Sequence, residues 1–259
     1  MSKIKIQHTA LNYVLDDFKK ELTIVFSNSL GTDLTMWDKQ VELLGAEFNI
    51  LRYDTRGHGK SEASEGEYSI EILGNDVLDL LDHLKIEKVN FCGLSIGGLT
   101  GQWLGIHAPE RLNKLILCNT AVKIGNKEGW NTRIETVQKN GLDSIVSGTQ
   151  ERWFTTEFVT KNKAEVDAVL ATFVQTPVAG YISCCAAVRD ADFTVEVSKI
   201  SVPTLIISGT EDLVTTIKDS DFLMEKIPNS ILAALKAAHI SNIEKADDFT
   251  KLLIEFIKN

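Results

Sequence analysis

The sequence has a shortage of positive charge, which excludes two classes of partner. Lys and Arg together number 27 against 36 Asp and Glu, so the formal net charge is −9. A protein without a basic excess lacks the electrostatic attraction that drives binding to nucleic acid or to anionic membranes. We therefore expect neither partner. An anionic substrate would need a local positive site in this acidic chain.

The sequence also lacks targeting, membrane-spanning and metal-binding patterns. Its first residues, MSKIK, have no apolar core of a signal peptide, and no run approaches the about 20 apolar residues of a membrane helix. The few cysteines have no zinc-site spacing, which predicts no metal site. Reduced, buried thiols in a cytoplasmic protein are expected instead. The four are Cys92, Cys118, Cys184 and Cys185.

What the 259 residues do contain is an alternation of buried strand-like runs with helical segments. This rhythm predicts a mostly parallel sheet covered by helices on both faces. An opening hairpin is expected from 3–8 and 11–16, with its turn around 9–10. The other predicted strands are 22–27, 49–53, 89–92, 112–118, 202–208 and 231–235; the predicted core helices are 36–44, 68–84, 99–107, 215–226 and 249–257.

The rhythm changes after the 112–118 strand. From 121 to 193 no strand-like run occurs, and helical pieces are expected at 130–140, 141–147, 163–176 and 178–187. This insertion leaves the sheet at the edge where open α/β sheets bind ligands. We therefore expect a core domain from 1–120 and 194–259, with 121–193 as a helical cap over that edge.

The most informative motif is GLSIGG at 93–98, which lies between a predicted strand and a predicted helix. A strand, a sharp turn bearing one serine, and a helix form the nucleophile elbow of hydrolases. Gly93 and Gly97 would flank Ser95 because side chains there would collide with the neighbouring strand and helix. A glycine-rich turn of no catalytic significance is the alternative, so the partners of a serine nucleophile must be found elsewhere in the chain.

A serine hydroxyl needs a general base, and the base needs an orienting carboxylate. Of the five histidines only His239 follows the last predicted strand, whereas His8, His58, His83 and His107 lie in an N-terminal hairpin, a loop or at helix ends. Asp212 follows the preceding strand and completes the order serine, acid, histidine. Its rivals are the neighbouring Glu211 and a purely structural function as the N-cap of the following helix.

These features together resemble the α/β-hydrolase family over essentially the whole chain, with DTRGHGKS at 54–61 as a further family mark. The resemblance implies an eight-stranded, mostly parallel sheet with a helical cap. It also implies an oxyanion hole formed by the backbone amides of Ile96 and Leu30. Residues 28–29, Asn-Ser, depart from the His-Gly usual in relatives, which matters little if the donor is an amide.

Finer motifs resemble 3-oxoadipate enol-lactonases. They are SLGTDLTMW at 29–37, QWLG at 102–105, WNTRI at 130–134, CCAAVRDADF at 184–193 and AAHISNIE at 237–244. The resemblance implies a carboxylic ester hydrolase of aromatic catabolism that opens a small anionic lactone through an acyl-enzyme. It calls for no metal or organic cofactor.

The substrate carboxylate requires a cation, and the cap holds Arg133, Arg152 and Arg189. Arg133 lies one helical turn after Trp130, so a guanidinium beside an aromatic ring is expected to bind a flat anion. Arg189 is a comparable candidate, although Asp190 and Asp192 could be its partners. Alternatively, Trp130 packs in the cap core and Arg133 forms a surface ion pair.

Two other functions stay open at this point. A general carboxylesterase or perhydrolase would use the same triad without preferring an anionic lactone. A small-molecule receptor would keep the fold and use the pocket only for binding. Ser95 argues against a dehalogenase, because that chemistry places an aspartate at the elbow. The sequence does not define the oligomeric state.

Overall fold

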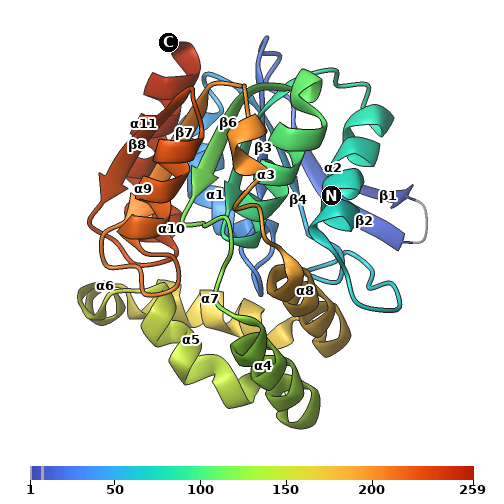
Figure 1. The fold of residues 1–259 in the computed structure, drawn as a ribbon, viewed down its shortest axis with the longest axis vertical. Coiled ribbons are helices and arrows are strands. Elements are labelled where there is room, and N and C mark those ends of the chain that lie inside the picture. Colours follow the sequence, from blue (N-terminus) through green and yellow to red (C-terminus); the bar gives the residue numbers. More distant parts are fainter. Residues whose placement is uncertain (1, 7–8) are drawn as a thin grey trace.

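The framework of the computed structural model, which describes residues 2–6 and 9–259, is one eight-stranded sheet (Figure 1). The strand order is β1-β2-β4-β3-β5-β6-β7-β8. The strands are β1 (Ser2–Ile6), β2 (Thr9–Asp16), β3 (Thr23–Ser27), β4 (Asn49–Tyr53), β5 (Val89–Leu94), β6 (Leu112–Cys118), β7 (Thr204–Gly209) and β8 (Ser230–Leu235). All pairs from β4 to β8 are parallel, and β2 pairs antiparallel with both β1 and β4.

The opening hairpin exists, but the residues expected in its turn belong to its second strand. Thr9 and Ala10, expected in the turn, belong to β2 and pair with Ile6 and Lys5. The expected end of the first strand at His8 lies outside the described residues. Thr9 also donates a side-chain hydrogen bond to the Glu62 carbonyl, which ties the start of β2 to the loop after β4.

Helices cover both faces of the sheet. The core helices are α1 (Asp38–Leu44), α2 (Ile70–His83), α3 (Ile96–His107), α9 (Ile217–Lys226), α10 (Ser241–Glu244) and α11 (Ala246–Lys258). Contacts join α2 to α3 on one side, and α1 to α11 on the other (Figure 1). The expected 36–44 helix begins as a 3₁₀ turn at Leu34–Trp37, because the Asp33 side chain caps Thr35 N at 2.9 Å.

Five helices between β6 and β7 gather beyond the carboxyl ends of the strands (Figure 1). They are α4 (Lys127–Asn140), α5 (Val146–Trp153), α6 (Thr156–Lys161), α7 (Lys163–Gln175) and α8 (Val178–Asp190). Helix α6 was not expected, and α5 extends well past the expected end at 147. Residues 121–193, all of which the structure describes, contain no strand.

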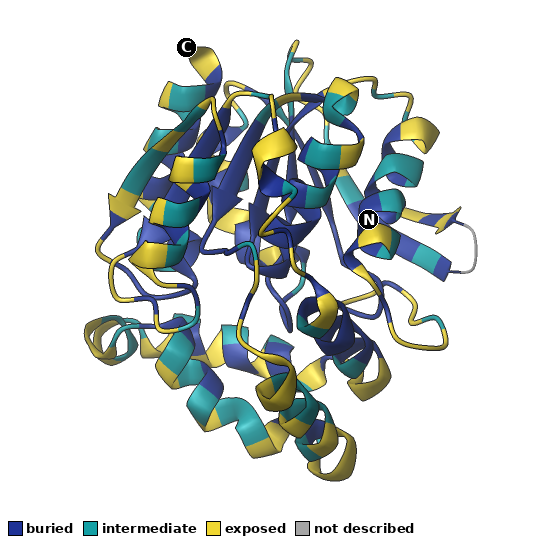
Figure 2. Ribbon diagram, in the orientation of Figure 1, coloured by how far each residue is buried: buried dark blue, intermediate teal, exposed yellow. Residues whose placement is uncertain are grey.

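Burial follows this layering (Figure 2). The central strand β5 is buried at all six positions, as expected for a strand covered on both faces. Helix α8 is buried nearly all round, and Gly180 lets it approach the loop after β4, where the Gly180 and Gly57 backbones meet. Within the described ranges no single helix is long and apolar enough to cross a membrane; α7 and α8 would pass only as a pair bent by 95°.

Candidate active site

Ser95 occupies a strained turn between β5 and α3. Its φ is 61° and its ψ −115°, values that a serine adopts only when the surroundings enforce them. The Ser95 amide donates to the Cys118 carbonyl at 3.0 Å, which fixes the turn against β6. A Cβ atom at Gly97 would lie 2.7 Å from the Ser27 carbonyl carbon, so only glycine fits there. The elbow geometry expected from GLSIGG is therefore present.

His239 and Asp212 meet in the buried junction beyond β7 and β8. His239 Nδ1 donates to Asp212 Oδ2 at 2.8 Å, and both side chains are nearly inaccessible. Burial acts to raise the pKa of Asp212. The charge and hydrogen bond of His239, together with the hydrogen bonds that Asn119 and the Val214 amide donate to the carboxylate, outweigh burial and hold the pKa at about 2. Asp212 is therefore an ionised carboxylate that orients the imidazole.

Burial and contacts distinguish Asp212 from the two alternatives, which were Glu211 as the acid and Asp212 as a helix N-cap. Glu211 is exposed, whereas Asp212 is buried and contacts His239. Helix α9 is capped by Thr216, so Asp212 is not its N-cap. Instead Asp212 Oδ1 accepts the amides of Val214 and Thr215 at 2.7 and 3.1 Å.

The two expected oxyanion donors belong to segments next to Ser95, since Ile96 follows it in the chain and Leu30 lines the same cavity. Ile96 begins α3, so its amide has no intrahelical acceptor, and Leu30 lies in the loop after β3. Neither amide donates to another residue in the described part of the chain. The Ser95 hydroxyl likewise makes no hydrogen bond there, so all these groups are available to a bound ligand.

A small cavity of about 50 Å³ brings the serine and histidine together with side chains of the cap. The core contributes Ser29, Leu30, Ser95, Val214 and His239; the cap contributes Ile124, Trp130, Arg133, Arg152, Trp153, Tyr181 and Val188. Ser95 and His239 thus open into one compartment, and apo geometry before substrate binding is commonly looser than in the reacting complex.

Two half-buried guanidinium groups in this cavity have no acidic partner among the described residues. Arg133 Nε donates to the Tyr181 hydroxyl at 2.7 Å, and its guanidinium lies 5.9 Å from the Trp130 ring centroid. Burial lowers the pKa of Arg152, and the neighbouring charge of Arg133 lowers it further. Glu151 offsets this effect on Arg152 in part, but neither arginine forms an ion pair within the described ranges, and two adjacent cations form a site for an anion.

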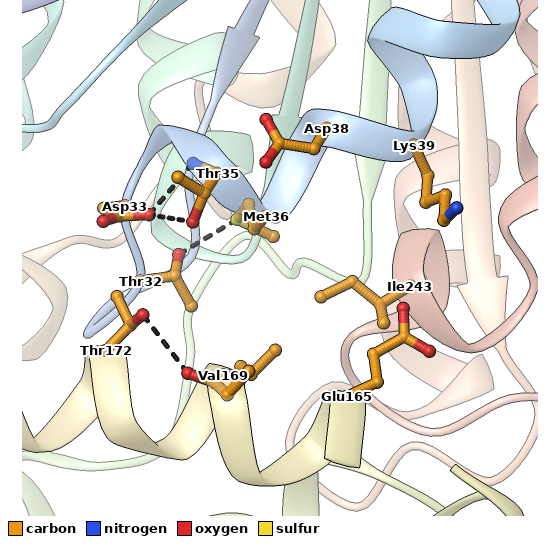
Figure 3. A pocket seen from close by; sticks show the side chains of 11 residues that line it. Thr32, Asp33, Thr35, Met36, Asp38, Lys39, Glu165, Val169, Thr172 and Ile243 are labelled. Atoms are coloured by element: carbon orange, nitrogen blue, oxygen red, sulfur yellow. Dashed lines mark hydrogen bonds between the residues drawn. The ribbon is translucent and has the colours of Figure 1, made fainter.

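A larger crevice of about 250 Å³ lies elsewhere, between the Leu34–Leu44 segment and α7 (Figure 3). Asp33, Asp38 and Glu165 give it an acidic lining, and neither Ser95 nor His239 reaches it. Asp33 is bonded to Thr35, and Asp38 to Arg52. The smaller cavity, not this one, therefore holds the candidate chemistry.

Comparisons with known proteins agree with this geometry. The family model described as the alpha/beta hydrolase fold matches residues 23–246. This decides the family. The chain belongs to the α/β-hydrolase fold family. It is 44% identical over 243 residues to 3-oxoadipate enol-lactonase 2 of Acinetobacter baylyi, covering 94% of this chain and 91% of that protein.

Two solved structures superpose closely on this α/β hydrolase. The enol-lactonase of Burkholderia xenovorans LB400 has a TM-score of 0.97 and 42% identity, with both chains covered completely. A hydrolase of Pseudomonas aeruginosa PA01 has a TM-score of 0.96 and 36% identity, covering 100% of this chain and 98% of that one.

The structure corrects the expectation that Arg189 contacts the substrate. Its Nη2 pairs with Glu67 at 2.8 Å and with Asp190 at 2.6 Å, and its Nη1 donates to Asn131. Arg189 is not among the residues that line the small cavity. Its charge is therefore already neutralised by Glu67 and Asp190, away from the small cavity. Asp192, the other expected partner, pairs with Lys123 instead.

Arg152 is the residue to which the sequence pattern assigned no function. It lies near the end of α5, in a segment beyond the expected helix, so its facing direction was not predictable. Tyr181 was missed for a similar reason: it lies on α8, yet its hydroxyl reaches Arg133 on α4. Both positions depend on how the cap helices pack, which no local motif encodes.

Proposed function

We propose that this α/β hydrolase opens 3-oxoadipate enol-lactone to 3-oxoadipate through a Ser95–His239–Asp212 triad. One observation carries the proposal: a serine at a strained elbow and a carboxylate-oriented histidine share a small cavity with two arginines that form no ion pair with any described residue. The cavity thus combines acyl-transfer groups with a receptor for a small anion. The enol-lactonases at 42% and 44% identity support the same assignment.

In the first half of the reaction Ser95 Oγ attacks the ring carbonyl while His239 Nε2 takes its proton. The amides of Leu30 and Ile96 hold the oxyanion, a contribution of about 100- to 1,000-fold in rate per donor. The ester C–O bond then breaks, and His239 returns the proton to the enol oxygen. The leaving group stays attached, because the ring opens without losing a fragment.

In the second half His239 deprotonates a water molecule, which attacks the acyl-enzyme carbonyl. The Ser95–acyl bond breaks, Ser95 recovers its proton from His239, and the free carboxylate leaves. The enol product tautomerises to the ketone, which makes the overall reaction favourable. Asp212 stays ionised throughout and stabilises the imidazolium.

The carboxylate arm of the lactone binds Arg133 and Arg152 in this proposal. Trp130 and Tyr181 flank the Arg133 guanidinium at 5.9 and 5.7 Å, which keeps its plane fixed for bidentate contact. This cation pair explains how a protein with a net charge of −9 receives an anion. A cytoplasmic location remains a prediction, and the four free, buried cysteines suit it.

The test follows the ultraviolet absorbance of enzymatically generated enol-lactone on addition of the purified protein. We expect rapid loss of absorbance with the wild type and none above background with Ser95→Ala. Arg133→Leu and Arg152→Leu should each raise KM for the lactone about 10- to 100-fold, the cost of one charge-assisted hydrogen bond. Both should spare a neutral p-nitrophenyl ester.

Arg189→Leu is the matched control, because it removes a cap arginine that lies outside the cavity. Equal losses on charged and neutral substrates in the two cavity variants would refute the anion site. Efficient turnover of neutral esters with no lactone activity would favour a general carboxylesterase. A biological response that survives Ser95→Ala would favour a receptor.

A further inference from the structure

Asn119 joins the three segments that carry the proposed triad. It follows β6 directly, and Thr120 beside it donates to the Ser95 carbonyl at 2.9 Å. Asn119 Nδ2 donates to Asp212 Oδ2 at 3.0 Å and to the Ala238 carbonyl at 3.2 Å. One amide therefore holds both the carboxylate and the residue that precedes His239.

The acceptor side of the same amide is also occupied. Ser241 Oγ donates to Asn119 Oδ1 at 2.5 Å, so the amide orientation is defined from both ends. Asn119 is 1% exposed, and it is absent from the residues that line the small cavity. Its contacts thus reach the triad without reaching the substrate.

The local backbone explains why asparagine occupies this position. Asn119 has a φ of 42°, in the left-handed region that asparagine tolerates better than most residues. The approach of its side chain to the His239 loop also requires Gly209. A Cβ atom there would lie 3.0 Å from Asn119 Nδ2 and would press on the loop carbonyls.

We propose that Asn119 is a positioning residue, which holds Asp212 and the His239 loop at the spacing from which His239 receives the Ser95 proton. The proposal rests on the proposed function of the triad. The charged and titratable groups around the junction are Asp212, His239 and Glu244, whose Oε2 accepts the Ala238 amide at 3.1 Å.

Asn119→Gly tests the amide itself, because glycine retains the backbone conformation and deletes both donors. We expect kcat for the enol-lactone to fall about 10- to 100-fold, the size of effect produced by small misplacements of catalytic groups. KM should stay within about twofold, because Asn119 does not contact the cavity.

Asn119→Asp tests the electrostatics while keeping the shape of the side chain. It places a second carboxyl group against Asp212 Oδ2, and two carboxyl groups at that distance compete for one proton instead of both ionising. The acid limb of the kcat/KM profile should therefore differ from that of the wild type by about one pH unit. A residue that merely shapes the turn would not produce this shift.

Asn90→Ala is the matched control. Asn90 is also buried, lies in β5, and donates only a long hydrogen bond of 3.4 Å to the Thr23 carbonyl. We expect it to lower Tm and to leave kcat and the acid limb unchanged. If both Asn119 variants behave like Asn90→Ala, with unchanged kcat per titrated active site, the proposal is overturned.

A second measurement separates this proposal from the lactonase assignment. A fluorophosphonate reports the reactivity of Ser95 directly, because Oγ attacks phosphorus and expels fluoride. Inactivation should slow in the Asn119 variants, and several-fold in Ser241→Ala, which frees Asn119 Oδ1. If the Asn119 variants are inactivated more slowly than the wild type but the wild type does not open the lactone, only the lactonase assignment is refuted. If the Asn119 variants do not fold, an unchanged rate in Ser241→Ala overturns the positioning function.

Discussion

His58 links the stability of this hydrolase to pH more strongly than an ordinary histidine would. It lies in the loop after β4 and is 1% exposed. Its Nδ1 lies 3.3 Å from the Arg56 carbonyl, and its Nε2 is buried with no partner among the described residues. Burial lowers the pKa of His58 to about 4, and the Arg56 carbonyl opposes this shift only in part.

The sign of the effect follows from the direction of the shift. The folded pKa of about 4 lies below the unfolded value of 6.5, so the unfolded chain binds the proton first. The contribution of the neutral His58 ring to the free energy of unfolding is fully present above pH 6.5 and is lost as the pH falls through 4. Its full size is about 3 kcal/mol, of which about 2 kcal/mol is lost between pH 7.5 and pH 5. This loss is a substantial fraction of the total stability of a domain, which is typically about 5–15 kcal/mol.

Urea unfolding followed by tryptophan fluorescence at pH 7.5 and pH 5 measures the effect. His58→Asn retains a donor for the Arg56 carbonyl and removes the titrating ring. Between pH 7.5 and pH 5 we expect the free energy of unfolding of this variant to fall by about 2 kcal/mol less than that of the wild type. His107→Asn, which changes an exposed histidine, serves as the control. The same pH dependence in His58→Asn and the wild type would refute the reasoning.

Two further predictions concern the elbow and the triad. Gly97→Ala forces a methyl group against the Ser27 carbonyl and should lower the free energy of unfolding by about 1–3 kcal/mol, with loss of kcat. Gly129→Ala in the exposed first turn of α4 should be neutral or stabilising, and unfolding at a common pH compares the two. Asp212→Asn should lower kcat about 10,000-fold, because the amide no longer selects the correct His239 tautomer, and it should also lower Tm, because the buried carboxylate accepts several hydrogen bonds. A loss of less than about tenfold would contradict the assigned function of Asp212.

The elbow was predictable because its residues form one short motif. Gly93 and Gly97 are required by backbone atoms a few residues away or on the adjacent strand, and this requirement appears directly as a short motif. Asp212, and not Glu211, turns inward and contacts His239, and its function in the triad stays a prediction. The pattern wrongly assigned Thr9 and Ala10 to a turn, because pairing with β1 and the hydrogen bond to Glu62 hold them in β2.

The amino-acid sequence predicted the family, the sheet and the elbow, because strand periodicity and the GLSIGG motif can be recognised within short stretches of chain. Only the tertiary structure decided which arginines face Ser95. Arg133, Arg152 and Arg189 all lie on helices of the cap, α4, α5 and α8. Packing of α4, α5 and α8 leaves the first two unpaired in the cavity, whereas Glu67, remote in sequence, neutralises the third. The contacts of Asn119 likewise required the tertiary structure, because its partners come from strand ends more than 90 residues away.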